Sequence, residues 1–183
     1  SGILPPTRGS ARVRGRVTPI LELGTGFDPE LTGLENIHLN ALLLGRRRTE
    51  VVARQREIVE WSGLGDFIRS PLRNYSSGMQ ARLGFAIAVA WVPEILILDE
   101  ILAVGDAEFV RFCESRLESF RAEGTTVLLV SHSPADVRST CDRCLWLDAG
   151  RMRADGPTES VLAVYEAATR GEADSRRRAT TGR

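Results

Sequence analysis

Two acidic residues at the end of an aliphatic run carry the clearest chemical signal in the sequence. The run is Ile95–Leu98, and Asp99 and Glu100 follow it directly. Four consecutive aliphatic residues predict a strand that is buried on both faces of a parallel sheet, and α/β sheets bind ligands at the carboxyl ends of such strands. There an Asp can hold Mg²⁺ on the phosphates of a nucleotide, and a following Glu can orient or deprotonate an attacking water. The alternative is a strand that simply ends in a solvated acidic turn.

A second candidate site lies in the segment Asn74–Gln80, which precedes a long apolar stretch. Ser76 or Ser77 is expected to cap a helix that ends near Trp91. Serine hydroxyls and the backbone amide of Gly78 at a helix N-terminus can bind an anion, and the helix dipole strengthens that binding. A serine cap without any ligand is the alternative interpretation.

A histidine provides the third candidate. His132 follows a second aliphatic run, Thr126–Val130, which is also expected to be a buried strand. A lone histidine at a strand end is most often an ordinary structural residue. Parallel strands end at one edge of the sheet, however, so His132 is expected near Asp99 and Glu100, where it could face the same phosphate.

Local patterns predict the elements that must hold these residues. Strands are expected at 12–17, 19–23, 95–98 and 126–130, and a hairpin is expected from 144–147 and 152–154. Helices are expected at 32–44 behind a capping box of Thr32 and Glu35, from Thr49 to about 61, at 76–91, from Asp106 to 124, from Pro134, and from Pro157 to about 168.

The order of these elements predicts an α/β fold with a parallel sheet. We divide the chain into an α/β core at 1–30 and 93–170, a helical lobe at 31–92, and a tail at 171–183. The tail holds no Val, Ile, Leu, Met or aromatic residue, so we expect it to be disordered.

Composition narrows the classes of protein. Of the 183 residues, 43% are apolar and 26% are charged, as in ordinary globular proteins. The 24 basic residues balance 24 acidic ones, which argues against a nucleic-acid partner. All 24 basic residues are arginine, so this chain cannot supply the lysine of a P-loop. Three cysteines do not make a disulfide framework, and a reducing compartment is therefore expected.

Taken in order, these motifs resemble the ATP-binding subunit of ABC transporters over residues 1 to about 165. The resemblance implies an ABC-type P-loop NTPase nucleotide-binding domain with an inserted helical subdomain. It places the signature loop at Ser76–Met79, the Walker B strand at Ile95–Glu100, the D-loop at Ala103–Asp106 and the switch histidine at His132. The stretch Leu21–Ile37 is similar to the ATPases that export O-antigen, capsule or teichoic acid. In that subfamily a glutamate, here Glu22, stands where most ABC ATPases have a glutamine.

The resemblance also implies roles and partners. ATP and Mg²⁺ are the implied cofactors, with Asp99 and Glu22 at the metal and with Glu100 and His132 in hydrolysis. The residues implied to contact a nucleotide across a head-to-tail homodimer are Ser76, Ser77, Gly78, Met79 and Asp106. The other implied partners are an integral-membrane permease and a lipid-linked polysaccharide cargo, with no nucleic acid. The implied location is the cytoplasmic face of the inner membrane.

One departure from the family pattern is large, because the phosphate-binding motif G-x-x-x-x-G-K-[ST] is absent. In the family this loop lies just upstream of where the chain begins, so we expect the chain to be incomplete at its N-terminus and inactive as an ATPase alone. A smaller departure is Ser133, where an acid often follows the histidine. The alternative function is a degenerate, non-hydrolytic half that serves as a binding or regulatory partner. An ABC ATPase acting on nucleic acid or ribosomes is disfavoured by the zero net charge.

Overall fold

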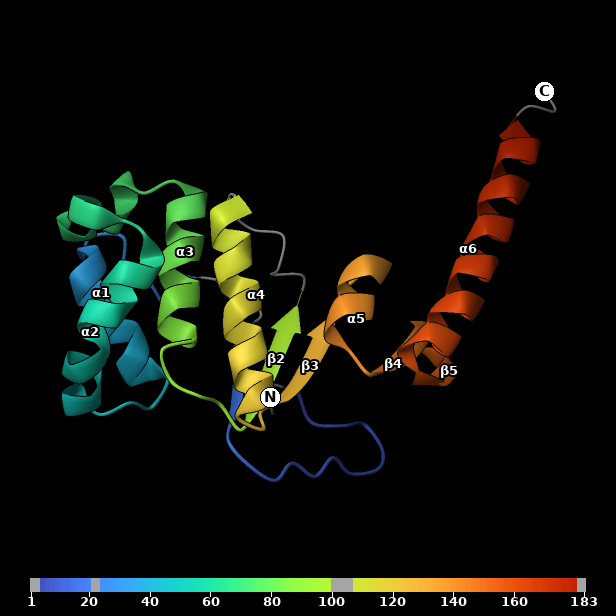
Figure 1. The fold of residues 1–183 in the computed structure, drawn as a ribbon, viewed down its shortest axis with the longest axis horizontal. Helices are drawn as coiled ribbons and strands as arrows, with labels where there is room; N and C mark the ends of the chain where they lie inside the picture. Colours follow the sequence, from blue (N-terminus) through green and yellow to red (C-terminus); the bar gives the residue numbers. More distant parts are fainter. Residues whose placement is uncertain (1–3, 21–23, 100–106, 181–183) are drawn as a thin grey trace. The chain divides into compact units, whose positions relative to one another are not determined.

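The computed structural model describes residues 4–20, 24–99 and 107–180, with the backbone alone at Glu108 and beyond Arg170. The chain forms two compact units, one that ends at Val130 and one that begins at Ser131. Figure 1 shows the elements of both units in chain order. Three of the predicted site residues, Glu22, Glu100 and Asp106, lie outside the described residues.

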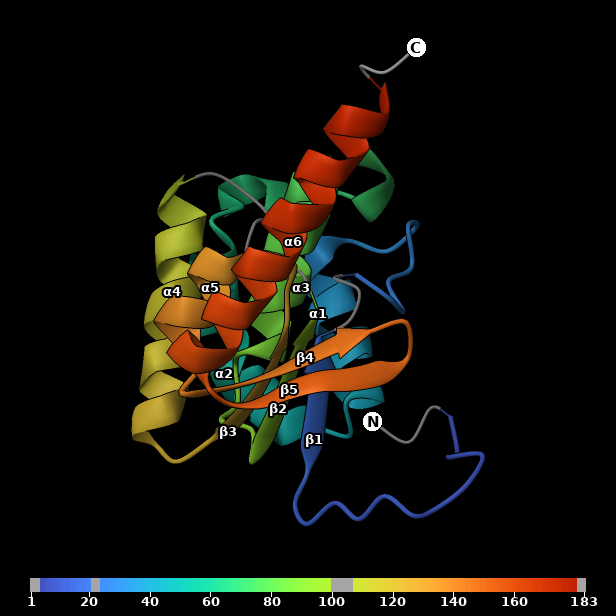
Figure 2. The ribbon, with the colours of Figure 1, turned by 90° about the vertical axis from the view of Figure 1, so that its right-hand side faces the viewer.

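A parallel sheet forms the base of the first unit (Figures 1 and 2). Its strands, in spatial order, are β1 (Val17–Ile20), β2 (Ile95–Asp99) and β3 (Thr126–Val130). β2 is central, and Leu98 pairs in register with Ile20 on one side and with Leu129 on the other. The predicted α/β architecture with a parallel sheet is confirmed. The predicted burial on both faces is wrong, because in β2 only Leu96 and Leu98 are buried and β3 has no buried residue.

The strand predicted at 12–17 is wrong. Residues 4–16 of the described chain contain no strand, and β1 begins only at Val17. Ladder pairing also begins there, where Val17 lies opposite Ile95. Just before it, the Arg16 N–H donates to a Glu94 carboxylate oxygen at 3.1 Å, outside the ladder. The alternating arginines imitate the period of a strand, but a strand forms only where a neighbour accepts its backbone hydrogen bonds.

Helices fill the chain between β1 and β2. They are α1 (Gly33–Leu43), α2 (Arg48–Ser62), α3 (Ser77–Ala88) and two short 3₁₀ turns, η1 (Gly65–Arg69) and η2 (Leu72–Asn74). The predicted capping box at α1 is confirmed. The Glu35 N–H donates to Thr32 Oγ1 at 3.3 Å, and the Thr32 N–H donates to Glu35 Oε2 at 2.8 Å. These bonds satisfy two backbone donors that the first turn would otherwise leave unpaired.

Helix α2 begins before the predicted cap, Thr49. The N-cap is Arg47, whose backbone N–H donates to Glu50 Oε2 at 2.7 Å. A reciprocal backbone–carboxylate bond therefore fixes this helix start, although arginine is not a usual capping residue. The helix ends at the predicted position, because Gly63 takes the left-handed conformation with φ of 63°.

Two apolar clusters hold the first unit together. The cluster inside the helical block contains Ile37, Val51, Ile58, Leu72, Leu83 and Ile87, among others. The second cluster joins the sheet to α3 and to α4 (Ala107–Ala122) through Ile20, Phe85, Leu96, Leu98, Phe109 and Phe120, among others. Helix α3 contributes to both clusters and therefore connects the helical block to the sheet.

An arginine reinforces that connection. The Arg116 guanidinium lies 4.7 Å from the ring centres of both Trp61 and Phe120. Its Nη2 also donates to the Val89 carbonyl at 2.8 Å, at the end of α3. Burial lowers the pKa of Arg116, yet arginine stays charged because its ordinary pKa is so high. One side chain thus links α2, α3 and α4.

The second unit is a helix, a hairpin and a longer helix (Figure 2). Its elements are α5 (Pro134–Thr140), β4 (Arg143–Asp148), β5 (Arg151–Pro157) and α6 (Thr158–Thr180). β4 and β5 are antiparallel, as predicted, and Ala149 and Gly150 make the turn with positive φ. Trp146 of β4 packs edge-on against Tyr165 of α6, with ring centres 5.7 Å apart.

The backbone of α6 continues through Thr180, whereas the sequence predicts a disordered tail from 171. The absence of large apolar residues removes any packing signal, but the Ala, Glu and Arg residues of this stretch favour helix by intrinsic propensity. Among the described residues, no helix is both long and apolar enough to cross a membrane.

Asn36 shows how a polar side chain can organise the start of the helical block. It is 0% exposed. Its Oδ1 accepts from the Asp28 N–H at 2.8 Å, and its Nδ2 donates to the Asp28, Leu31 and Thr32 carbonyls at 2.9, 3.1 and 3.0 Å. The side chain therefore satisfies the turn that leads into α1.

We expect Asn36→Ala to lower the free energy of unfolding by about 1–3 kcal/mol, because buried backbone groups would lose their partner. Asn40→Ala is the matched control, since Asn40 makes one exposed bond to the Thr25 carbonyl at 2.9 Å. Urea unfolding of both variants measures the difference. Equal losses in the two variants would contradict the assignment.

Candidate functional site

The segment predicted as an anion site begins helix α3. Ser76 is the N-cap, and its Oγ accepts from the Met79 N–H at 3.2 Å. Ser77 is the first residue of the helix, so the structure decides between the two serines that the sequence left open. Both serines are exposed. Their hydroxyls therefore lie beside the amides of the first helical turn, where the helix dipole favours an anion.

A shallow hollow of about 430 Å³ adjoins this helix start. It is lined by Gly63, Leu64, Phe67, Ser76, Gly78, Met79 and Arg82. The Phe67 side chain is 55% exposed there, so the hollow combines an apolar ring with hydroxyl, amide and guanidinium donors.

Helix α3 also contacts the beginning of α4. The Arg82 guanidinium lies 5.2 Å from the ring centre of Phe109. Phe85 lies on the next turn of α3 and packs edge-on against the same ring, with the two ring centres 5.6 Å apart. Phe109 lies in the first turn of α4, directly after the segment predicted as the D-loop at 103–106. Helices α3 and α4 therefore contact each other through Arg82, Phe85 and Phe109.

Asp99 lies where the sequence placed it. It is the last residue of β2, it is exposed, and it pairs in register with Val130 at the end of β3. An exposed carboxylate at the carboxyl edge of a parallel sheet offers the oxygen ligand that Mg²⁺ prefers, and water and phosphate can supply the remaining ligands. Within the described residues, no three acidic, His or Cys side chains gather into a metal cluster.

His132 is the second residue of the second unit and lies two residues after β3. Its neighbours fix the local backbone, because the Ser133 N–H donates to Ser131 Oγ at 3.0 Å. Ser133 then caps α5, where its Oγ accepts from the Asp136 N–H at 3.3 Å. The predicted proximity of His132 to Asp99 stays a prediction. Glu22, Glu100 and Asp106 lie outside the described residues, and their roles likewise stay predictions.

Four residues with structural contacts in the two units had no role in the sequence interpretation. They are Asn36, Arg82, Arg116 and Arg138. Asn36 could have been found as a polar residue on the buried side of an amphipathic helix, next to Ile37. The contacts of Arg82 with Phe109, Arg116 with Trp61 and Arg138 with Glu159 carried no usable signal, because these partners lie far apart in the sequence.

The parallel sheet with an acidic strand end, together with a helical block that presents a serine-capped helix, defines an α/β nucleotide-binding domain. The family described as "ABC transporter" matches residues 4–103. The chain belongs to this ABC transporter family.

Proteins that are similar to this chain are named as ATP-binding proteins of export systems. The O-antigen export system ATP-binding protein RfbB of Klebsiella pneumoniae is 49% identical over 168 residues, covering 92% of this chain and 68% of that protein. The teichoic acids export ATP-binding protein TagH of Listeria monocytogenes is 41% identical over 166 residues, covering 91% of this chain and 49% of that protein. This chain thus spans about two thirds of the first relative and half of the second.

Solved structures show the same fold. One described as "Structure of ATP binding subunit of ABC transporter" superimposes with a TM-score of 0.71 at 24% identity, covering 82% of this chain and 62% of that one. At this identity the comparison shows the fold alone. It confirms the predicted ABC-type P-loop NTPase fold.

The two serines at the start of α3 are expected to differ in their effect on stability. Ser76→Ala should lower the free energy of unfolding by about 0.5–2 kcal/mol, because it removes the cap of the Met79 amide. Ser77→Ala should change it by less than about 0.5 kcal/mol, as exposed substitutions generally do. Chemical denaturation of the two variants tests the assignment, and a larger loss for Ser77→Ala would overturn it.

Proposed function

We propose that this chain is the nucleotide-binding part of the motor of an ABC exporter for a surface polysaccharide. The observation that carries the proposal is the 49% identity, over 92% of the chain, to the O-antigen export protein of Klebsiella pneumoniae. The teichoic acids export proteins extend this support to a second surface polymer. A lipid-linked polysaccharide is accordingly the cargo, and an integral-membrane permease at the cytoplasmic face of the membrane is the partner.

On one side of the proposed site, residues act on the nucleotide bound by their own subunit. Asp99 and Glu22 would hold Mg²⁺ through their carboxylate oxygens, and the bound metal would neutralise charge on the phosphate oxygens of ATP. Glu100 accepts a proton from the attacking water. His132 donates a hydrogen bond to the terminal phosphate.

On the other side, the start of α3 is offered to a nucleotide bound by a second copy of the subunit. Ser76, Ser77, Gly78 and Met79 provide this surface, and Asp106 lies at the same dimer contact. Ser76 Oγ accepts from the Met79 amide, and a hydroxyl that accepts one bond still has its own hydrogen to donate. Ser76 can therefore cap the helix and bind a phosphate oxygen at the same time.

The 183-residue chain by itself is expected to hydrolyse no ATP. It contains 24 arginines and no lysine, whereas P-loop enzymes use a lysine to hold the β- and γ-phosphates. Phosphate release by the purified chain with Mg²⁺ and ATP measures this. Magnesium-dependent turnover that disappears in Glu100→Gln would contradict the expectation.

A chimera tests the export function itself. In it, this chain replaces the 168 matching residues of the Klebsiella pneumoniae O-antigen export protein. We expect the chimera to restore surface O-antigen in a strain that lacks the original protein. Glu100→Gln should abolish that restoration, because water activation is lost. Glu118→Gln, the same chemical change on the exposed side of α4, should leave restoration intact.

The chimera also distinguishes the alternative function, a non-hydrolytic binding or regulatory partner, which the missing lysine favours. A chimera that accumulates normally but neither hydrolyses ATP nor restores O-antigen would support the alternative. Restoration that survives Glu100→Gln would also argue against the motor.

A further inference from the structure

Helix α5 directly follows His132 but has little packing of its own. It is seven residues long, and none of its residues is buried. A helix of this length is unstable in isolation, because too few hydrogen bonds follow its costly nucleation. Contacts with the rest of the second unit must therefore hold it.

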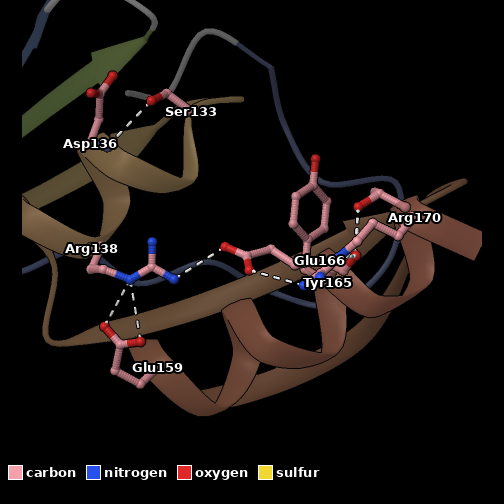
Figure 3. Close-up of polar contacts among 8 residues, drawn as sticks. Ser133, Asp136, Arg138, Glu159, Tyr165, Glu166 and Arg170 are labelled. Atoms are coloured by element: carbon pink, nitrogen blue, oxygen red, sulfur yellow. Dashed lines mark hydrogen bonds and ion pairs between the residues drawn. The ribbon is translucent and has the colours of Figure 1, made fainter. Parts of the chain in front are cut away.

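Arg138 provides the principal side-chain contact between α5 and α6 (Figure 3). Its Nε donates to both carboxylate oxygens of Glu159, at 3.0 and 3.3 Å. Its Nη2 donates to Glu166 Oε1 at 3.1 Å. Glu159 and Glu166 are seven residues apart, which places them two turns apart on one face of α6. The two carboxylates raise the pKa of Arg138 above its ordinary value.

A second contact holds the C-terminal end of α5, close to Arg138 in the last turn of the helix. Thr158, the buried first residue of α6, donates through Oγ1 to the Cys141 carbonyl at 2.7 Å. Its backbone N–H donates to the Asp142 carbonyl at 3.2 Å. Cys141 is the C-cap of α5, so α6 contacts α5 at its C-terminus as well as at Arg138. Thr158 contacts only the residues that follow α5, whereas Arg138 bonds to α6 from within the helix itself.

The N-terminus of α5 carries the effect to His132. Ser133 caps the helix by accepting from the Asp136 N–H, and its own N–H donates to Ser131 Oγ. The second of these bonds spans His132, so the His132 backbone is tied to the residue that caps α5. We propose that Arg138 is a positioning residue, which holds α5 on α6 so that His132 is oriented before a nucleotide arrives. The inference rests on the proposed function for the role of His132 in hydrolysis.

The effect is expected to be local. Exposed ion pairs contribute little each to global stability, and the Arg138 and Glu159 side chains are 43% and 71% exposed. The fold of the second unit rests instead on the hairpin and on the packing of Trp146 against Tyr165. Loss of Arg138 should therefore loosen α5 without unfolding the unit.

The chain offers a convenient probe, because it contains only two histidines. The imidazole NMR signals of the full chain therefore report His132 and an internal reference, His38, whose Nε2 lies 2.7 Å from Gln55 Oε1 in the first unit. In Arg138→Gln we expect the His132 signal to shift or broaden while the His38 signal stays in place. Amide hydrogen exchange in α5 should become several-fold faster, with exchange in β4 and β5 unchanged.

Arg143→Gln is the matched control. Arg143 also makes a two-bond exposed ion pair in the second unit, with Asp155 at 2.8 and 2.7 Å, but it lies on the hairpin. It should leave His132 unchanged. Glu159→Gln and Glu166→Gln should each give part of the Arg138→Gln shift, which keeps the test valid if the arginine variant folds poorly. A His132 signal that is unmoved in Arg138→Gln, or equally moved in Arg143→Gln, overturns the proposal.

A second readout separates positioning from simple stability. In the chimera described above, Arg138→Gln should lower kcat several-fold and leave the KM for ATP nearly unchanged, and Arg138→Lys should recover part of the loss. A drop in folded protein with normal kcat per folded molecule would argue against positioning. The NMR test needs no nucleotide, so an inactive chimera would refute the export function without deciding the role of Arg138.

Discussion

The burial of helix α3 against two separate apolar clusters is the constraint on which the first unit depends. Leu83 and Ile87 are fully buried in the helical block, while Phe85 and Val89 are fully buried against the sheet and α4. Full burial of one such side chain is worth about 1.5–3 kcal/mol. A helix fixed on both sides cannot rotate, so its exposed N-terminus with Ser76 is held in one orientation. Burial of the rest of α3 therefore fixes the orientation of the proposed nucleotide-binding surface.

Arginine takes a structural role throughout this lysine-free chain. Arg46 stacks on Trp91 at 5.0 Å, Arg82 stacks on Phe109, and Arg116 stacks on Trp61 and Phe120. The Nε atoms of Arg46 and Arg116 are buried without a hydrogen-bond partner among the described residues, as expected for guanidinium planes that lie on rings. A planar guanidinium can stack and donate hydrogen bonds at once, which an ammonium cannot do equally well. The same property lets Arg138 join two carboxylates two turns apart on α6.

The groups that the proposed mechanism uses belong to two different structural units. The acidic end of β2 and the serine-capped helix belong to the first unit, whereas His132 belongs to the second. Each group is held by interactions inside its own unit: ladder pairing for Asp99, burial of α3 for Ser76, and the contacts of α5 with α6 for His132.

The sequence by itself determined the features that depend on neighbours in the chain. The aliphatic run before Asp99 predicts a buried parallel strand, Thr32 and Glu35 predict a capped helix, and Ala149–Gly150 predicts a hairpin turn. Each pattern is sufficient to predict its element, because the hydrogen bonds or the hydrophobic period that define it involve residues only a few positions apart.

Tertiary structure alone decided the features whose partners are distant. The alternating arginines before Val17 find no strand to pair with, and Arg47 rather than Thr49 starts α2 through the carboxylate of Glu50. Arg138 meets glutamates 21 and 28 residues away, a pairing that no local pattern encodes. Such contacts form only when packing has already brought the elements together, because their energy is too small to organise the chain beforehand.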